Sequence, residues 1–191
     1  MGGDRLILGI SGASGAILGY YLAKAIRNQG IELHMVVTEA AELTWNLETG
    51  KELRELTEIA DVLYDPRDMA AELSSGSYRT MGMIIAPCSM KTLAGIVTGY
   101  TDNLLLRAAD VCMKEGRKCV LCPREMPLGK LHLRNLNAAA ELGCVIVPPM
   151  LSFYSGQTTV EDQIHHIVGK VLMQFGVEYE NFHPWKSSNG L

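Results

Sequence analysis

The feature that most constrains the fold is an alternation between short apolar runs and longer stretches with helical periodicity. Five runs have the composition of buried strands, at residues 6–10, 33–37, 83–86, 119–122 and 144–147. Because strands separated by helical patterns form parallel sheets, this order predicts an α/β fold, a Rossmann-like or flavodoxin-like three-layer sandwich around a central parallel sheet. We expect a single domain over residues 1–191. From about residue 180 we expect a tail that packs on a neighbouring subunit or on the chain's own surface.

Composition excludes several classes of partner. The 191 residues carry a formal net charge of −4 and contain no basic block, so neither a nucleic-acid groove nor an anionic membrane surface is expected. No apolar run approaches the ~20 residues that span a bilayer, and the N-terminus lacks a secretory signal pattern. We therefore expect a cytoplasmic protein with a small-molecule ligand. Since 48% of the residues are hydrophobic, a monomer would expose apolar patches, which favours a homo-oligomer.

The cysteines and histidines do not form a metal-binding pattern. Cys119 and Cys122 have the spacing of a zinc or redox pair, but on a strand residues three apart face opposite sides. His165 and His166 are adjacent on a predicted helix, where neighbours diverge by about 100 degrees. We expect free thiols and no metal site.

The carboxyl ends of the predicted strands gather polar groups at one edge, where open α/β sheets bind ligands. Residues 11–15, with the sequence SGASG, lead from a strand into a helix and have neither the dinucleotide nor the Walker glycine spacing. Their N–H groups and two serine hydroxyls form an anion site in principle, and a turn made only for packing is the equal alternative. Ser89 and Thr92 stand at a second helix start of the same design. Two such starts on one edge favour a phosphorylated ligand.

Three further features have both an ordinary and a functional interpretation. Arg107, Asp110 and Lys114 share one helix stripe, either as a solvent face with an Asp110 to Lys114 pair or as a cationic strip facing a neighbouring subunit's site. Glu39 is either a solvated helix start, which we favour, or an acid that binds a ribose. Residues 63–80 lose periodicity and are expected to form a mobile loop over a site.

Five motifs taken together resemble the UbiX-type flavin prenyltransferases: GISGASGA, PCSMKTLAGI, RAADVCMKEGRK, PREMPLGKLHLRN and VPPMLSFY. The resemblance spans nearly the whole chain. It implies that reduced FMN and dimethylallyl monophosphate react so that the dimethylallyl group joins N5 and C6 of the flavin. The prenylated FMN would serve a UbiD-type decarboxylase, and relatives form dodecamers with sites at subunit contacts. Asp65 and Asp68 lie in a proline-containing loop rather than in an aspartate-rich diphosphate motif, so we expect no metal requirement.

The resemblance also implies roles for individual residues. The FMN contacts would be Gly12, Ala13, Ser14, Thr38, Ser89, Met90, Lys91, Thr92 and Arg124. The catalytic residues would be Ser14, Glu48, Lys114 and Glu125, and the contacts to the prenyl donor would be Arg107, Lys114, Tyr154 and Lys170. Many relatives have arginine at the position of Lys170, and lysine keeps the charge but not the bidentate geometry.

These residue types suit the chemistry. Cleaving an allylic C–O bond releases phosphate, which the cations Lys114, Lys170 and Arg124 would stabilise. Glu125 or Glu48 would deliver a proton to the phosphate or remove one from flavin C6.

The alternatives are a flavin-dependent cysteine decarboxylase, a non-catalytic flavin-binding subunit of an aromatic acid decarboxylase, and direct decarboxylation of an aromatic acid by this chain. The first would carry an asparagine-bearing loop and an essential histidine, whereas this chain has PCSMKT and no histidine in its first two loops. The second would not need the charged residues Glu48, Lys114 and Glu125. For the third, no separate acid-binding site is evident.

Overall fold

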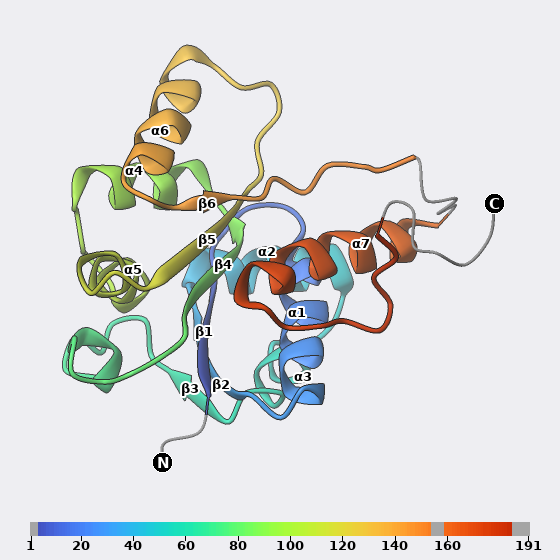
Figure 1. Cartoon of the computed structure of the whole chain (residues 1–191), viewed down its shortest axis with the longest axis horizontal. Coiled ribbons are helices and arrows are strands. Elements are labelled where there is room, and N and C mark those ends of the chain that lie inside the picture. The colour runs from blue at the N-terminus through green and yellow to red at the C-terminus, as the bar shows by residue number, and fades with distance from the viewer. Residues whose placement is uncertain (1–3, 154–158, 185–191) are drawn as a thin grey trace.

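Six strands form one parallel sheet in the computed structural model, which describes residues 4–153 and 159–184 (Figure 1). The sheet has the order β3-β2-β1-β4-β5-β6, the doubly wound order of Rossmann folds, and this confirms the predicted fold class. The strands are β1 (Arg5–Ile10), β2 (Glu32–Val37), β3 (Val62–Tyr64), β4 (Gly82–Cys88), β5 (Lys118–Pro123) and β6 (Val145–Ile146). Each of the five predicted runs coincides with a strand, and β3 is an addition.

The segment predicted as an irregular loop, residues 63–80, is only partly irregular. It begins within β3, which continues the sheet beyond β2 by pairing Tyr64 with Val36. A 3₁₀ turn, η1 (Glu72–Ser74), follows and buries Leu73. The apolar run of β3 has only three residues and stands between Asp61 and Asp65, whereas the short β6 lies in an apolar run of four residues, so only β6 was recognisable from the sequence. The prediction of a plain loop from residue 63 is therefore wrong, although Pro66 does line a cavity at the carboxyl edge of the sheet.

Helices cover both faces of the sheet (Figure 1). One face carries α1 (Ala16–Asn28), α2 (Glu39–Thr49), α3 (Arg54–Thr57) and α7 (Val160–Leu172), the last followed by η2 (Met173–Phe175). The other face carries α4 (Met90–Thr98), α5 (Leu104–Lys114) and α6 (Lys130–Glu141). The three layers place every βα connection from β1, β2, β4 and β5 at the carboxyl edge of the sheet.

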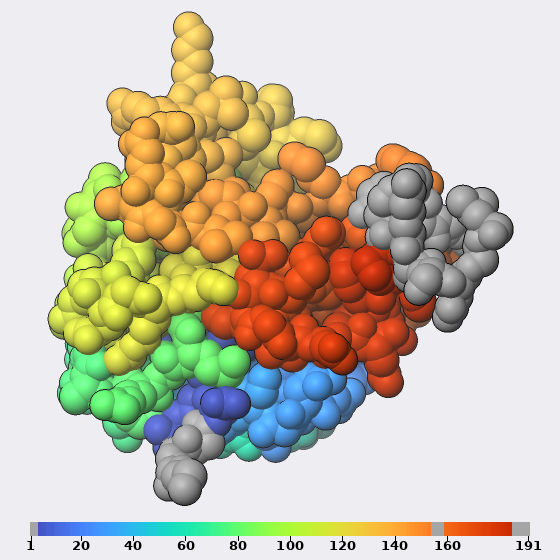
Figure 2. All heavy atoms as spheres, in the orientation of Figure 1, coloured from blue at the N-terminus to red at the C-terminus, as the bar shows by residue number. Residues whose placement is uncertain are grey.

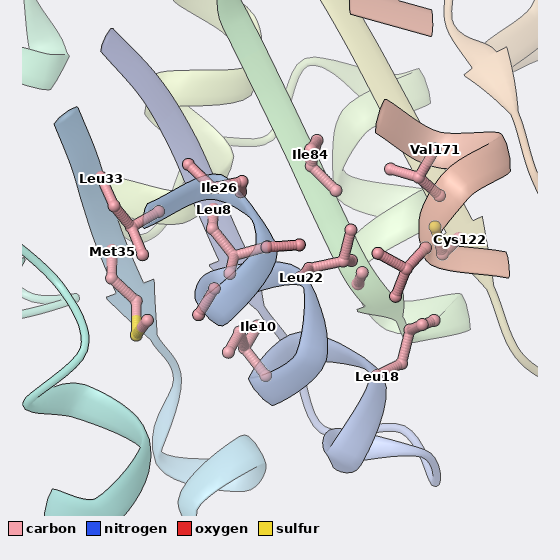
Figure 3. Packing of buried hydrophobic residues seen from close by; sticks show 14 of the residues in the cluster. Leu8, Ile10, Leu18, Leu22, Ile26, Leu33, Met35, Ile84, Cys122 and Val171 are labelled. Atoms are coloured by element: carbon pink, nitrogen blue, oxygen red, sulfur yellow. The ribbon is translucent and has the colours of Figure 1, made fainter. Parts of the chain in front are cut away.

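Each central strand contributes to both hydrophobic clusters, because successive side chains alternate between the faces. On β1, Leu8 and Ile10 pack against Leu22 and Ile26 of α1 (Figure 3). Ile7, which directly precedes Leu8 and points to the other side of the sheet, belongs to the cluster on the opposite face. Burial of each such side chain contributes about 2 kcal/mol, so the strands that carry the carboxyl-edge loops are firmly fixed.

Two predictions about the cysteines are confirmed: the thiols are free, and Cys119 and Cys122 face opposite sides of a strand. All five are free and buried. Cys119 packs in the cluster with α5, whereas Cys122 packs in the cluster with α1 and α7, so the two thiols face opposite sides of the sheet. Burial raises the pKa of Cys112 to about 11 and that of Cys122 to about 12. Among the described residues, no group of three or more histidine, cysteine or acidic side chains is arranged to hold a metal ion.

The surface carries exposed apolar side chains around α6. In the space-filling view, α6 and the segment after β6 form a lobe at one end of the molecule (Figure 2). Exposed residues in this region are Met126, Leu128, Leu131, Leu133, Met150, Leu151 and Phe153. Such a concentration is typical of a surface that contacts another protein.

The tail lies only partly within the described residues. Phe182 packs closely on Gly169 of α7, whereas Trp185 lies outside them. Over the two described ranges, no helix has both the length and the apolar character needed to cross a bilayer.

Candidate active site

A cleft of about 530 Å³ opens at the carboxyl edge beside β1, β2 and β4, where the strand order reverses. We call it the switch-point cleft. Its lining comes from the loop after β1 and from the starts of α2, α4 and α5, together with the segment after β3. The lining residues are Gly12, Thr38, Glu39, Ala40, Pro66, Arg67, Ser89, Lys91, Thr92, Asp102 and Asn103.

Three helices begin at this cleft, and each is capped by a side chain. Thr38 Oγ1 accepts a hydrogen bond from the N–H of Ala41 at 3.2 Å, and Asn103 Oδ1 accepts one from Leu106 at 3.0 Å. Ser89 Oγ accepts from the N–H of Thr92 at 3.2 Å. Of the remaining first-turn N–H groups, that of Leu104 donates to the carbonyl of Pro66 at 2.8 Å. The others have no acceptor within their helices, and the helix dipoles add partial positive charge there. The cleft is therefore suited to a phosphate group.

Close packing of Gly12 brings the loop after β1 against α2. A Cβ at Gly12 would lie 2.4 Å from Cβ of Ala40 and 3.0 Å from its carbonyl carbon. The first distance is sterically impossible and the second is unusually tight, so only glycine fits while α2 keeps its position. Gly12 thus determines how closely the first turn of α2 approaches the loop.

Ser11 fixes the loop after β1 to the end of β4. Its buried hydroxyl donates to the carbonyl of Pro87 at 2.9 Å and accepts from the N–H of Ser89 at 2.8 Å. Of the two serines predicted to face an anion, Ser11 is therefore a structural residue. Ser14, the other, lies half-buried in the same loop.

The start of α1 is not open to a ligand, contrary to one interpretation of the SGASG loop. The carboxylate of Glu48, at the end of α2, accepts hydrogen bonds from the N–H of Gly15 at 2.9 and 3.1 Å and from Ala16 at 3.1 Å. The predicted free N–H groups of α1 are thus already bonded to a carboxylate of this chain. Glu48 lies at this position because α2 packs beside α1, a contact that no local pattern reveals.

A second cavity, of about 490 Å³, lies beyond β5 and β6. We call it the Arg124 hollow; its lining includes Arg124, Glu125, Met126 and Pro148. The N–H of Arg124 donates to the carbonyl of Cys88 at 3.2 Å, so this loop is joined to the residue that precedes Ser89. The Glu125 side chain is exposed. Arg124 and Glu125 are therefore placed on the same edge as the switch-point cleft.

Arg107 and Lys114, both on α5, are predicted to contact the prenyl donor, but neither lines a cavity of its own chain described above. Arg107 pairs with Asp110 at 2.7 Å and donates to the carbonyl of Ser74 at 3.3 Å. The expected pair between Asp110 and Lys114 does not form. Lys114 ends a helix of 11 residues that starts at the cleft, which places it roughly 16 Å along the axis toward the amino edge of the sheet. Within a single chain, the structure does not bring Lys114 to the cleft.

Of the other two residues predicted to contact the prenyl donor, Lys170 is on α7 and is the one that lies within the described residues. Lys170 is half-buried, and its Nζ lies 5.6 Å from the centre of the Phe182 ring. No residue of α7 in the described part of the chain lines the switch-point cleft or the Arg124 hollow. Tyr154 lies outside the described residues.

Comparisons with known proteins show which family the chain belongs to. The sequence profile of the Flavoprotein family matches residues 1–176. A probable UbiX-like flavin prenyltransferase from Sedimentibacter hydroxybenzoicus is 56% identical over 185 residues, which cover 96% of this chain and 98% of that protein. The chain belongs to the UbiX-type flavin prenyltransferases. The predicted family and class of enzyme are thereby confirmed.

Solved UbiX-type structures have the same fold. AnUbiX (PadA1), solved in complex with FMN and dimethylallyl pyrophosphate, is 41% identical, with a TM-score of 0.95 over 97% of this chain and 99% of that one. A dodecameric FMN-dependent UbiX-like decarboxylase from Escherichia coli O157:H7 is 50% identical, with a TM-score of 0.93 over 96% of this chain and 100% of that one.

Sequence reasoning missed several residues of this UbiX-type cleft. Asp102 and Asn103 line it because they precede α5, and the N-cap preference of asparagine before the run LLL could have indicated this helix start. Arg67 reaches the cleft from the segment after β3, and no sequence signal marked it. Glu39, favoured as a solvated helix start, is indeed the exposed first residue of α2, although it also lines the cleft.

Proposed function

We propose that this chain transfers the dimethylallyl group of dimethylallyl monophosphate to N5 and C6 of reduced FMN, giving prenylated FMN. The observation that carries the proposal is the convergence of three capped helix starts on one cleft in a UbiX-type chain. When bound, reduced FMN supplies the two flavin positions that are alkylated. The cleft fits a flavin monophosphate, because helix N–H groups are preferred donors to phosphate oxygens.

The phosphate end of FMN is assigned to the switch-point cleft. Thr38 and Thr92 have hydroxyl hydrogens to donate, and Lys91 adds a cation. Ser89 and Met90 belong to the start of α4, where N–H groups face the cleft. Gly12, Ala13 and Ser14 form the loop beside it, and by resemblance their backbone is assigned to contact the flavin ring system.

The reacting end is assigned to the side of Arg124 and Glu125. Cations there stabilise the phosphate that leaves the donor, which is the step in which negative charge develops. Arg124 is assigned this role, and Lys170 and Tyr154 are assigned to the donor by resemblance alone. Glu125 or Glu48 would deliver a proton to the leaving phosphate or remove the one lost from flavin C6. Ser14, whose neutral hydroxyl is not a base, is assigned next to the flavin by resemblance alone.

Lys114 and Arg107 are assigned to the site of a neighbouring subunit. For Lys114 this is supported by its position roughly 16 Å along α5 from the cleft, since a role in the same chain would require a large rearrangement of α5. Arg107 lies about one turn from the start of α5, where Asp110 and the carbonyl of Ser74 already hold its guanidinium. The exposed apolar residues around α6 support a homo-oligomer, and the dodecamer of the related E. coli protein provides a specific arrangement.

A UbiD-type decarboxylase is the proposed recipient of the product. The cytoplasmic location and the absence of a metal requirement stay predictions from the sequence. Loss of activity in EDTA, restored by a divalent cation, would contradict the second.

The proposed reaction can be tested through phosphate release. With reduced FMN and dimethylallyl monophosphate together, we expect one inorganic phosphate per flavin consumed, and none when either substrate is omitted. Glu125→Gln should slow release by about 100-fold or more, because general acid catalysis contributes that much. Glu58→Gln, which removes an exposed carboxylate outside both cavities, is the matched control. Phosphate release without flavin would indicate a simple phosphatase.

A further inference from the structure

The switch-point cleft balances each of its cations with an acid. Lys91 Nζ lies 3.3 Å from a carboxylate oxygen of Asp102. Arg67 lies 3.1 Å from Asp65 and 4.0 Å from Glu39, and its guanidinium holds the pKa of Asp65 below the ordinary value. Among the described lining residues, the two positive side chains are thus offset by two negative ones, Glu39 and Asp102. Phosphate binding there depends on helix starts and hydroxyls rather than on surplus cationic side chains.

Asp102 is the acid that competes most directly with a bound phosphate. It precedes Asn103, the cap of α5, which donates to it through Nδ2 at 3.2 Å. Lys91 comes from the first turn of α4, so the ion pair joins two of the three helix starts. A phosphate at these starts must draw the Lys91 ammonium away from Asp102.

We infer that Asp102 sets the affinity of the cleft for the phosphate end of the flavin by holding Lys91, and thereby speeds release of the product. The inference rests on the proposed function, in which FMN is a substrate and prenylated FMN must leave after each turnover. A cofactor that stays bound gains from maximal affinity, whereas a released product does not. Asp102 is thus an affinity-determining residue rather than a catalytic one.

Removing this carboxylate should change binding more than folding. The Lys91 side chain is 66% exposed and that of Asp102 is 34% exposed, and ion pairs of this kind contribute little to the stability of the folded chain. A phosphate that binds at the same rim is sensitive to the free charge of Lys91, because its other partners are fixed helix groups. The effect of Asp102 on phosphate affinity can therefore be measured separately from its effect on folding stability.

The test compares FMN with riboflavin, which lacks the phosphate, on the intact oligomer. For Asp102→Asn we expect FMN to bind about threefold to tenfold more tightly and to dissociate more slowly by a similar factor, with riboflavin affinity unchanged. Glu58→Gln, which also removes one negative charge, should change neither affinity. Thermal unfolding of both variants checks that the fold is retained, and Asp102→Ser provides a second substitution if the asparagine variant is unstable.

A double variant tests whether Asp102 acts through Lys91. In a Lys91→Met background, Asp102→Asn should give clearly less tightening, because only the direct repulsion between Asp102 and the phosphate remains to be removed. Unchanged or weaker FMN binding in Asp102→Asn would overturn the inference, as would equal tightening for riboflavin or tightening of undiminished size without Lys91. Flavin binding is measured without the prenyl donor, so failure of the proposed transfer reaction would be seen separately in the phosphate-release assay.

Discussion

At the scale of residues, Gly12 shows how one position determines the shape of the cleft. Its missing side chain lets the loop after β1 touch α2, where a Cβ would lie 2.4 Å from Ala40. The sequence marks this loop only as rich in small residues. The requirement for glycine depends on α2, which is placed by tertiary packing and is not visible in a local pattern.

Gly12→Ala should weaken FMN binding by roughly tenfold to a hundredfold, because relieving such an overlap costs about 1–3 kcal/mol. Fluorescence titration with FMN measures the loss. The double variant Gly12→Ala with Ala40→Gly removes the closest contact and should recover part of the affinity. Full affinity in the single variant would contradict the assigned close packing.

Glu48 illustrates a limit of sequence reasoning at the same scale. The residue could be singled out only by resemblance, because its partners, Gly15 and Ala16, are more than 30 positions away in the chain. Ser89 and Thr92 were predictable, since both act within one helix start that the sequence shows directly. Local capping can be predicted from sequence, whereas capping between elements depends on the fold.

At the scale of elements, the start of a helix can contribute both to the stability of the folded chain and to the binding of a phosphate. Ser89 caps α4 at the cleft, and Thr159 caps α7, none of whose described residues lines the cleft. The two caps are of the same kind, with the hydroxyl accepting from the N–H three residues on. Comparing these two caps therefore separates the contribution of a cap to folding stability from its contribution to FMN binding.

Ser89→Ala and Thr159→Ala should each lower the free energy of unfolding by about 1 kcal/mol, the usual loss on removing a cap. Only Ser89→Ala should also weaken FMN binding. Chemical denaturation and flavin titration of both variants provide the comparison. Equal effects of the two variants on FMN affinity would argue against a phosphate at the start of α4.

The elements also show what sequence periodicity can reveal. Five strands were recognisable because each lies in an apolar run of at least four residues, buried on both faces except in the part-buried β6. β3 was missed, because its apolar run of three residues stands between Asp61 and Asp65 and is recognisable only through its pairing with β2. The same absence of local signal explains why Arg67, which follows β3, was not foreseen in the cleft.

At the scale of the whole molecule, the residues assigned to the prenyl transfer do not all lie together within one chain. Glu125 lies at the carboxyl edge, whereas Lys114 ends α5 near the opposite edge. Sequence motifs identified both residues and offered a neighbouring subunit's site as one interpretation of Lys114, but only the fold shows how far Lys114 lies from the cleft of its own chain. That division depends on how chains assemble.

Mixed oligomers test this division. Chains with Glu125→Gln and chains with Lys114→Met should each be nearly inactive alone. When the two are unfolded and co-assembled in equal amounts, about a quarter of the sites combine an intact Glu125 with an intact Lys114 from a neighbour, so about a quarter of wild-type activity should return. Wild-type chains treated in the same way are the control. No recovery would indicate that both residues act within one chain.

The mass of the flavin after one anaerobic incubation tests the proposed prenyl transfer itself. The protein is mixed with reduced FMN and dimethylallyl monophosphate, the reaction is quenched, and the released flavin is analysed by mass spectrometry. We expect a flavin heavier than FMN by one five-carbon prenyl unit, formed only when both substrates and the protein are present. A flavin of unchanged mass, from protein shown to bind FMN, would contradict the proposed prenyl transfer.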